Sequence, residues 1–114
     1  MDELINYFPQ VVSQLEKALA PSPNVLDQAR TARLVRVTFD PESNAGYVYI
    51  RSGRDLNVVE QNIIGIKHGR TMEIPGDVWM NIDLDNFDRL IGIELLEVSP
   101  LLAALLTDLA HLYP

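Results

Sequence analysis

Residues 33–51, RLVRVTFDPESNAGYVYIR, decide the fold. Two runs in which apolar and polar residues alternate flank the short polar segment DPESN. Alternation with a period of two is typical of a strand that buries one face. In the first run it places Val35 and Val37 on the face opposite Arg36 and Thr38. The stretch therefore predicts two half-buried strands joined as a β-hairpin.

The polar segment between these runs has the chemistry of a turn. Asp40 and Pro41 favour the start of a turn. Asn44 tolerates the left-handed backbone conformation near its end. These residues need no ligand to explain them.

The same periodicity continues to residue 98. It predicts further strands within residues 58–67, 78–84 and 90–98. The segment 67–77, KHGRTMEIPGD, is predicted as a hairpin loop or a brief break in a strand. Because the connections are short and rich in Gly, Asn and Asp, an antiparallel meander of about five strands is the simplest topology.

Residues 2–19 are predicted as helix, because apolar side chains recur there at three- and four-residue spacing. Pro9 interrupts the pattern, so either the helix kinks there or it begins at Pro9 after a short N-terminal turn. Residues 24–30 are predicted as one short turn with Asn24 as its N-cap.

The chain is also predicted to end in a helix, with Ser99 as its N-cap and Pro100 as its first residue. This helix is apolar over most of its circumference and needs cover on more than one side. Either it lies under the N-terminal helix and over the sheet, or it forms a homodimer interface.

These elements predict an α+β fold, an antiparallel meander sheet with N- and C-terminal helices packed on one face. We expect one domain over residues 1–114, with a helical segment at 1–31, the sheet at 32–98 and a helix at 99–114.

Composition narrows the class of protein. The chain has 114 residues, a net charge of -7, a pI of about 4.6 and no cysteine. A phosphate backbone rewards Lys and Arg, so we expect no nucleic-acid partner. An acidic surface suits a basic protein partner, although acidity also serves solubility alone. No apolar run approaches the ~20 residues that span a bilayer, and the N-terminus lacks a basic signal sequence, so we expect a cytoplasmic protein without a membrane partner.

The sequence offers few groups for catalysis. His68 and His111 are the only histidines, and nothing in their spacing brings them together. The stretch DLDNFDRLIGIE, residues 83–94, resembles a calcium loop at its first, third and twelfth positions only. Phe87 and Asp88 stand where that loop needs an oxygen ligand and a glycine, so a β-turn fits better. We therefore predict no catalytic residue, no metal ligand and no cofactor.

The outer face of the sheet is the predicted binding surface. If Val48 faces the helices, Tyr47 and Tyr49 point outward, and Trp79 does so by the same alternation. Outward aromatic side chains ringed by Asn, Asp and Arg have the composition of a protein-interaction surface. The predicted binding residues are Tyr47, Tyr49, Trp79, Asp83 and Glu94. The alternative is that these aromatics pair across strands for stability.

Two stretches together resemble a bacterial family, the domain of unknown function 2283. FDPESNAGYVYI and DLDNFDRLIGIELLEVS match its two signatures, and the likeness covers roughly residues 35–99. The resemblance supports the sheet and gives no activity. The family usually has glycine where this chain has Asp88, a residue that can also take a left-handed turn position. Gly92 and Glu94 match, and Glu94 is the carboxylate that the resemblance favours for a role.

Members of that family often sit beside small toxin-like proteins, which implies an antitoxin or immunity role. The sequence thus favours a non-catalytic protein-interaction module, antitoxin-like or immunity-like, with a homodimer as one possible form. The alternative is a small-ligand-binding protein or an enzyme that uses a carboxylate such as Asp40, Asp83 or Glu94.

Overall fold

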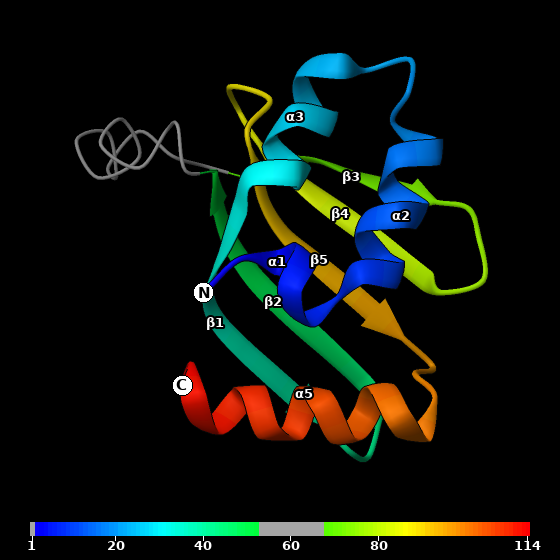
Figure 1. Ribbon diagram of the computed structural model, residues 1–114, viewed down its shortest axis with the longest axis vertical. Helices are drawn as coiled ribbons and strands as arrows, with labels where there is room; N and C mark the ends of the chain where they lie inside the picture. The colour runs from blue at the N-terminus through cyan, green and yellow to red at the C-terminus, as the bar shows by residue number, and fades with distance from the viewer. Residues whose placement is uncertain (1, 53–67) are drawn as a thin grey trace.

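The computed structural model describes residues 2–52 and 68–114. Within them, strands form one antiparallel sheet in the order β1-β2-β5-β4-β3, and helices lie at both ends of the chain (Figure 1). The strands are β1 (Ala32–Asp40), β2 (Ala45–Ser52), β3 (His68–Ile74), β4 (Trp79–Asp85) and β5 (Leu90–Leu96). The helices are α1 (Leu4–Tyr7), α2 (Pro9–Ala18), α3 (Pro23–Thr31) and α5 (Pro100–Leu112). The predicted α+β class, with a five-stranded antiparallel sheet and helices at both ends, is confirmed.

The order of the strands departs from a simple meander. β3, β4 and β5 are successive neighbours, but β2 pairs with β5 and not with β3. Residues 67–77, predicted as a loop or a break, contain β3. In that strand Met72 and Ile74 extend the apolar inner face, and Pro75 then removes a donor from the ladder. The strand predicted at 58–67 lies outside the described residues.

A β-bulge in β1 changes which side chains reach the core. The register shifts between Leu34 and Arg36, which leaves Val35 as the extra residue. Leu34 and Val37 are both buried, whereas Val35 is 42% exposed. The prediction that Val35 shares a face with Val37 is therefore wrong, because one extra residue reverses the alternation.

The two ends of the chain meet at the edge of β1. The N–H of Leu34 donates to the carbonyl of Asp2 at 2.6 Å, and the N–H of Val37 donates to the carbonyl of Tyr113 at 2.8 Å. The Tyr113 hydroxyl in turn donates to the Asp2 carboxylate at 2.6 Å. Unpaired groups on an edge strand are a template for association with another chain, and these contacts close the edge at two positions.

The N-terminal helical pattern is broken at Phe8. α2 begins at Pro9, which confirms the alternative of a new helix there, since proline suits the first helical position. The same preference places Pro23 at the start of α3. The prediction of Asn24 as N-cap is therefore wrong, and α3 is a longer helix preceded by Ser22.

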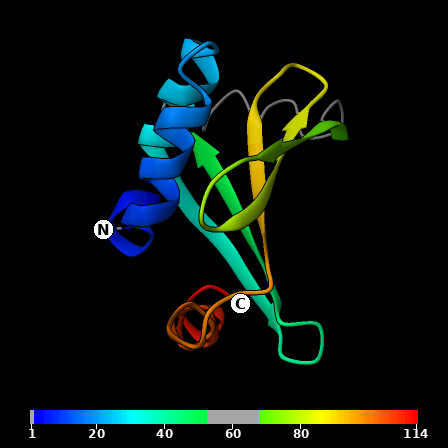
Figure 2. The same ribbon diagram turned by 90° about the vertical axis from the view of Figure 1, so that its right-hand side faces the viewer.

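The helices lie on one face of the sheet (Figure 2). α2 and α3 cover one part of that face, and α5 crosses another part beside the N-terminal helices, not beneath them (Figure 1). Gly46 of β2 allows α5 to pack closely on the sheet, because an added Cβ would lie 2.7 Å from Cδ1 of Leu106. None of the described helices is long and apolar enough to cross a membrane. The core lies between the two layers and includes Leu15, Met80, Ile82, Ile93, Leu106 and Leu109.

Candidate functional site

The predicted binding residues divide between two surfaces. Trp79, at the start of β4, is exposed on the same side of the strand as Asn81 and Asp83, as alternation predicts, and it also lines one end of a groove beside the helices. The other four gather on the outer face of the sheet. Together with two polar neighbours they form what we call the outer-face cluster: Tyr47, Tyr49, Thr71, Asn81, Asp83 and Glu94.

Gly92 organises the outer-face cluster. In the register of the sheet, Tyr47 stands opposite Glu94, and Gly92 stands opposite Asp83. The Tyr47 ring leans diagonally over Gly92, where an added Cβ would lie 2.0 Å from the tyrosine oxygen. This geometry lets the Tyr47 hydroxyl donate to Oδ2 of Asp83 at 2.5 Å. Because Gly92 has no side chain, Tyr47 of β2 can reach across β5 and bond to Asp83 of β4.

The Asp83 carboxylate is engaged at both oxygens. Tyr47 donates to one oxygen, and the Thr71 hydroxyl of β3 donates to the other at 2.5 Å. Burial raises the pKa of Tyr47 well above its usual value, and the hydrogen bond and negative charge of Asp83 raise it further. Tyr47 therefore remains a proton donor to Asp83 at physiological pH, and this pair stabilises the sheet.

The remaining members of the cluster also contact one another. The Asn81 amide donates to Oε1 of Glu94 at 3.1 Å. The Tyr47 and Tyr49 rings lie 4.5 Å apart between centroids, and the Arg36 guanidinium lies 5.6 Å from the centre of the Tyr49 ring. The Asn81–Glu94 and Arg36–Tyr49 pairs join neighbouring strands, and such cross-strand pairs are stabilising in an antiparallel sheet. These contacts give both tyrosines a stabilising role within the sheet.

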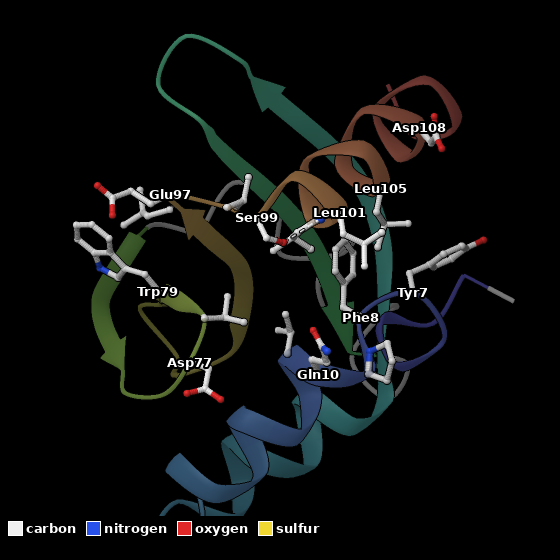
Figure 3. A pocket seen from close by; sticks show the side chains of 16 residues that line it. Tyr7, Phe8, Gln10, Asp77, Trp79, Glu97, Ser99, Leu101, Leu105 and Asp108 are labelled. Carbon is white, nitrogen blue, oxygen red and sulfur yellow. Dashed lines mark hydrogen bonds between the residues drawn. The ribbon is translucent and has the colours of Figure 1, made fainter.

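The groove lies between α1, the start of α2, the β3–β4 turn and α5, and its volume is about 650 Å³ (Figure 3). Leu101 and Leu105 of α5 line one side, and Tyr7 and Phe8 line the other. Trp79 and Glu97 lie together at one end. Three segments that are distant in the sequence, within residues 7–11, 77–79 and 96–108, thus enclose one largely apolar depression.

The β3–β4 wall of the groove is fixed by Gln14 of α2. Its side-chain amide donates to the Val78 carbonyl at 2.8 Å, and its carbonyl accepts from the Val78 N–H at 3.0 Å. Gly76 packs directly on the Gln14 side chain and has a φ of 147°, a conformation suited to glycine. The turn is therefore held against the helix by a two-way clamp.

The α5 wall is held in place by the turn between β1 and β2. Asn44 takes the predicted left-handed conformation, with φ of 53°, and its side-chain amide donates to the Val98 carbonyl at 2.9 Å. The Val98 N–H donates back to the Asn44 carbonyl at 3.2 Å. Ser99 then caps α5 by accepting from the Leu102 N–H, as predicted. Both walls are thus positioned by specific hydrogen bonds.

The groove combines exposed apolar side chains with an acidic rim. Leu101 is 84% exposed and Trp79 is 49% exposed. Among the described residues that line the groove, three carry carboxylates, Asp77, Glu97 and Asp108, and none is Lys, Arg or His. We call these three residues the acidic rim. The arrangement can hold an apolar group and, beside it, a positive charge.

Sequence reasoning named Trp79 but missed the rest of the groove. One feature of the sequence indicates the groove: the apolar stripe of the last helix is too broad for the sheet alone to cover. Residues such as Leu101 and Leu105 therefore need another neighbour. The stripe was interpreted as either core or dimer interface, because which other segments face it is decided by tertiary packing.

The other candidates of the sequence are placed apart from this groove. His68 begins β3, and His111 lies in the last turn of α5. Asp85 is buried and accepts from the N–H groups of Phe87 and Arg89, so it organises the β4–β5 turn. Within residues 2–52 and 68–114, no group of three or more His, Cys, Asp or Glu side chains is placed to hold a metal ion.

Comparison with known proteins adds no relative: no protein-family model, curated protein or solved structure matches the chain.

Proposed function

We propose that this chain is a non-catalytic protein-interaction module that binds a basic partner protein through the groove. An antitoxin or immunity role, which the family resemblance in residues 35–99 implies, would fit such a module. The observation that carries the proposal is an apolar groove whose charged lining residues, within the described part of the chain, are all acidic.

Exposed apolar surface supports a binding role for the groove. Leu101 is 84% exposed, so its side chain buries little apolar area in the isolated chain. Contiguous apolar surface with a polar rim is typical of sites that bind proteins or ligands. Leu101, Leu105 and Trp79 supply such a surface, and tryptophan is enriched among the residues that dominate binding energy.

Charge supports a basic partner. The acidic rim adds to a chain whose net charge is already -7. Opposite fields speed the encounter of two proteins and disfavour acidic competitors. A partner with Lys or Arg around an apolar centre would match both properties of the groove.

The outer-face cluster supports binding less well than the groove. The Asp83 carboxylate already accepts from Tyr47 and Thr71, and Glu94 already accepts from Asn81. A partner would have to replace hydrogen bonds that the cluster makes internally, at a cost of about 1–3 kcal/mol for each group left unpaired. We therefore place the binding site of the proposed module in the groove.

A homodimer through α5 is a second possible state. Leu101 and Leu112 are exposed on this helix, at 84% and 68%. A second copy would bring its own acidic rim and its own net charge toward the first. Like charges across an interface are unfavourable, so a basic partner fits the groove better than another copy does.

A small apolar ligand is the alternative that the volume of the groove favours. Small-molecule sites typically measure about 300–1,000 Å³, and this groove lies in that range. Mass spectrometry under native conditions, on chain purified from its own cells, would reveal a bound small molecule. Such a ligand would replace protein binding as the preferred function.

The proposed function is tested by affinity capture from cells that carry the gene, with quantitative comparison of matched variants. Leu101→Lys places a positive charge on the groove wall and removes an apolar contact. Leu112→Lys makes the same change on the same helix, at a residue that does not line the groove. We expect the partner recovered by the native chain to fall at least tenfold with Leu101→Lys and to stay within about twofold with Leu112→Lys.

Two outcomes with these variants would contradict the proposal. Equal recovery by Leu101→Lys and the native chain would remove the groove as the binding site. Loss with both variants would point to the whole exposed face of α5. Circular dichroism of each variant checks that the fold is retained, since both leucines lie at the surface.

A further inference from the structure

We infer that the occupant of the groove is an amphipathic helix of the partner, with an apolar stripe flanked by Lys or Arg. This inference rests on the proposed function and adds the structural class of the bound segment. Three properties of the groove lead to it: the absence of a free strand edge among its described walls, the spread of its apolar side chains, and the sign of its rim.

The strands that reach the groove cannot accept another strand. β4 lies between β3 and β5, and β5 lies between β2 and β4, so both are paired on each side. At the groove, Trp79 of β4 stands opposite Leu96 of β5. An extended segment entering there would find no row of backbone groups with which to form a ladder.

The nearby backbone is also engaged within the chain. Both backbone groups of Val78 are bonded to Gln14, and both groups of Val98 are bonded to Asn44. A segment buried among side chains must satisfy its own N–H and C=O groups. The α-helix is the one regular element that does so within a single segment. The groove therefore favours a helix over an extended peptide.

The apolar wall suits one face of such a helix. Leu101 and Leu105 are one helical turn apart on α5, so they present a continuous apolar ridge. Tyr7 and Phe8 line the opposite side of the groove, and Trp79 lies at one end beside Glu97. An incoming helix with apolar residues at every third and fourth position would pack its stripe against this ridge.

The acidic rim specifies the charge beside that stripe. Asp77, Glu97 and Asp108 are all exposed and belong to two of the three segments that enclose the groove. Lys or Arg residues that flank the apolar stripe could reach them while their alkyl stems cover apolar surface. Another copy of α5 would instead bring Asp108 toward the same rim, which disfavours a self-complex.

Trp79 makes the experiment direct, because it is the single tryptophan of the chain and lines the groove. Its fluorescence is measured while a synthetic helix of about 18 residues is added, long enough to form helix readily on binding. The probe has Leu along one stripe and Lys elsewhere. A second peptide has the same composition without the stripe, and a third has Glu in place of Lys.

We expect a saturable blue shift of Trp79 emission with the first probe only, and at least tenfold weaker binding of the other two. Raising the salt from about 50 mM to about 500 mM should weaken binding several-fold, because exposed charges are screened. Leu101→Lys should weaken binding at least tenfold, and Leu112→Lys should leave it within about twofold.

Each other outcome overturns the inference. Equal binding of the peptide without a stripe would mean attraction by charge alone, and equal binding of the Glu peptide would mean that the rim does not select. If no peptide binds while Leu101→Lys still abolishes capture of the natural partner, the helical occupant is wrong and the proposed function stands. If capture survives Leu101→Lys, the proposed function itself is wrong.

Discussion

The outer-face cluster and the groove both display aromatic side chains, but they use their polar groups differently. In the cluster, Asp83 accepts hydrogen bonds from Tyr47 and Thr71, so its polar groups are satisfied within the fold. In the groove, Leu101 and Trp79 extend into solvent beside carboxylates of a single sign. Exposed aromatics are therefore a poor guide to function until their partners within the fold are known.

This difference separates stability from binding. Changes in the outer-face cluster should lower the free energy of unfolding and leave the groove able to bind. Changes at the surface of the groove should do the reverse. Substitutions on each surface test that separation.

Gly92→Val should be the most destabilising of these changes. A Cβ at this position would overlap the Tyr47 hydroxyl, so the ring must leave and its hydrogen bond to Asp83 is lost. We expect the free energy of unfolding to fall by about 2–4 kcal/mol, combining overpacking with a broken hydrogen bond to a charged group. Denaturant unfolding at neutral pH measures this loss.

Binding of the basic probe helix provides the control for Gly92→Val. The variant that remains folded in the absence of denaturant should bind the probe within about twofold of the native chain, because Gly92 lies on the opposite face from the helices. If Gly92→Val leaves the free energy of unfolding unchanged, or if it abolishes binding of the probe helix, the two surfaces are not separate in this way.

Tyr47→Phe isolates the hydrogen bond from the packing of the ring. It removes the donor to Asp83 and keeps the aromatic ring over Gly92. We expect the free energy of unfolding to fall by about 1–2 kcal/mol, the lower part of the usual range for a bond to a charged group because the site is only partly buried. Tyr49→Phe, on the same strand and face, is the matched control and should change stability by less than about 0.5 kcal/mol.

Alkaline pH should reveal the same bond. Burial and the Asp83 carboxylate raise the pKa of Tyr47 in the folded chain above its ordinary value of 10.0. A group whose folded pKa is raised contributes stability that is complete below the unfolded pKa and is lost as pH rises above it. Unfolding measured between pH of about 9 and about 11 should therefore lose stability more steeply in the native chain than in Tyr47→Phe. Equal slopes would mean that Tyr47 ionises without linkage to folding.

Local pattern predicted much of the sheet but not its irregularities. Alternation identified β2, β4 and β5, and turn chemistry correctly placed Asn44 in a left-handed conformation. The bulge at Val35 was missed, because it coincides with backbone bonds to Asp2 and Tyr113 at opposite ends of the chain. The alternation of apolar and polar residues along a strand does not reveal such contacts between distant segments.

The candidate sites divide in the same manner. Tyr47 and Asp83 could be assigned to one face from alternation alone, but their direct bond depends on the missing side chain of Gly92 between them. The groove depends on the meeting of three segments, held by Gln14 and Asn44 through bonds that span many residues. Sequence reasoning therefore found the surface that follows strand periodicity and missed the one made by tertiary packing.

Asp108→Asn should have the smallest effect, and it tests the rim alone. The change removes one carboxylate from the groove and leaves the apolar ridge of α5 intact. We expect the basic probe helix to bind about 1.5- to 5-fold more weakly, as for one exposed ion pair. Stability should change by less than about 0.5 kcal/mol, because Asp108 is exposed. Glu73→Gln is the matched control, since it lowers the negative charge of the chain equally at a residue of β3 that does not line the groove. If both variants weaken binding to the same extent, the net charge of the chain attracts the helix and the acidic rim gives no local selectivity; weakening by Asp108→Asn alone places that selectivity at the groove.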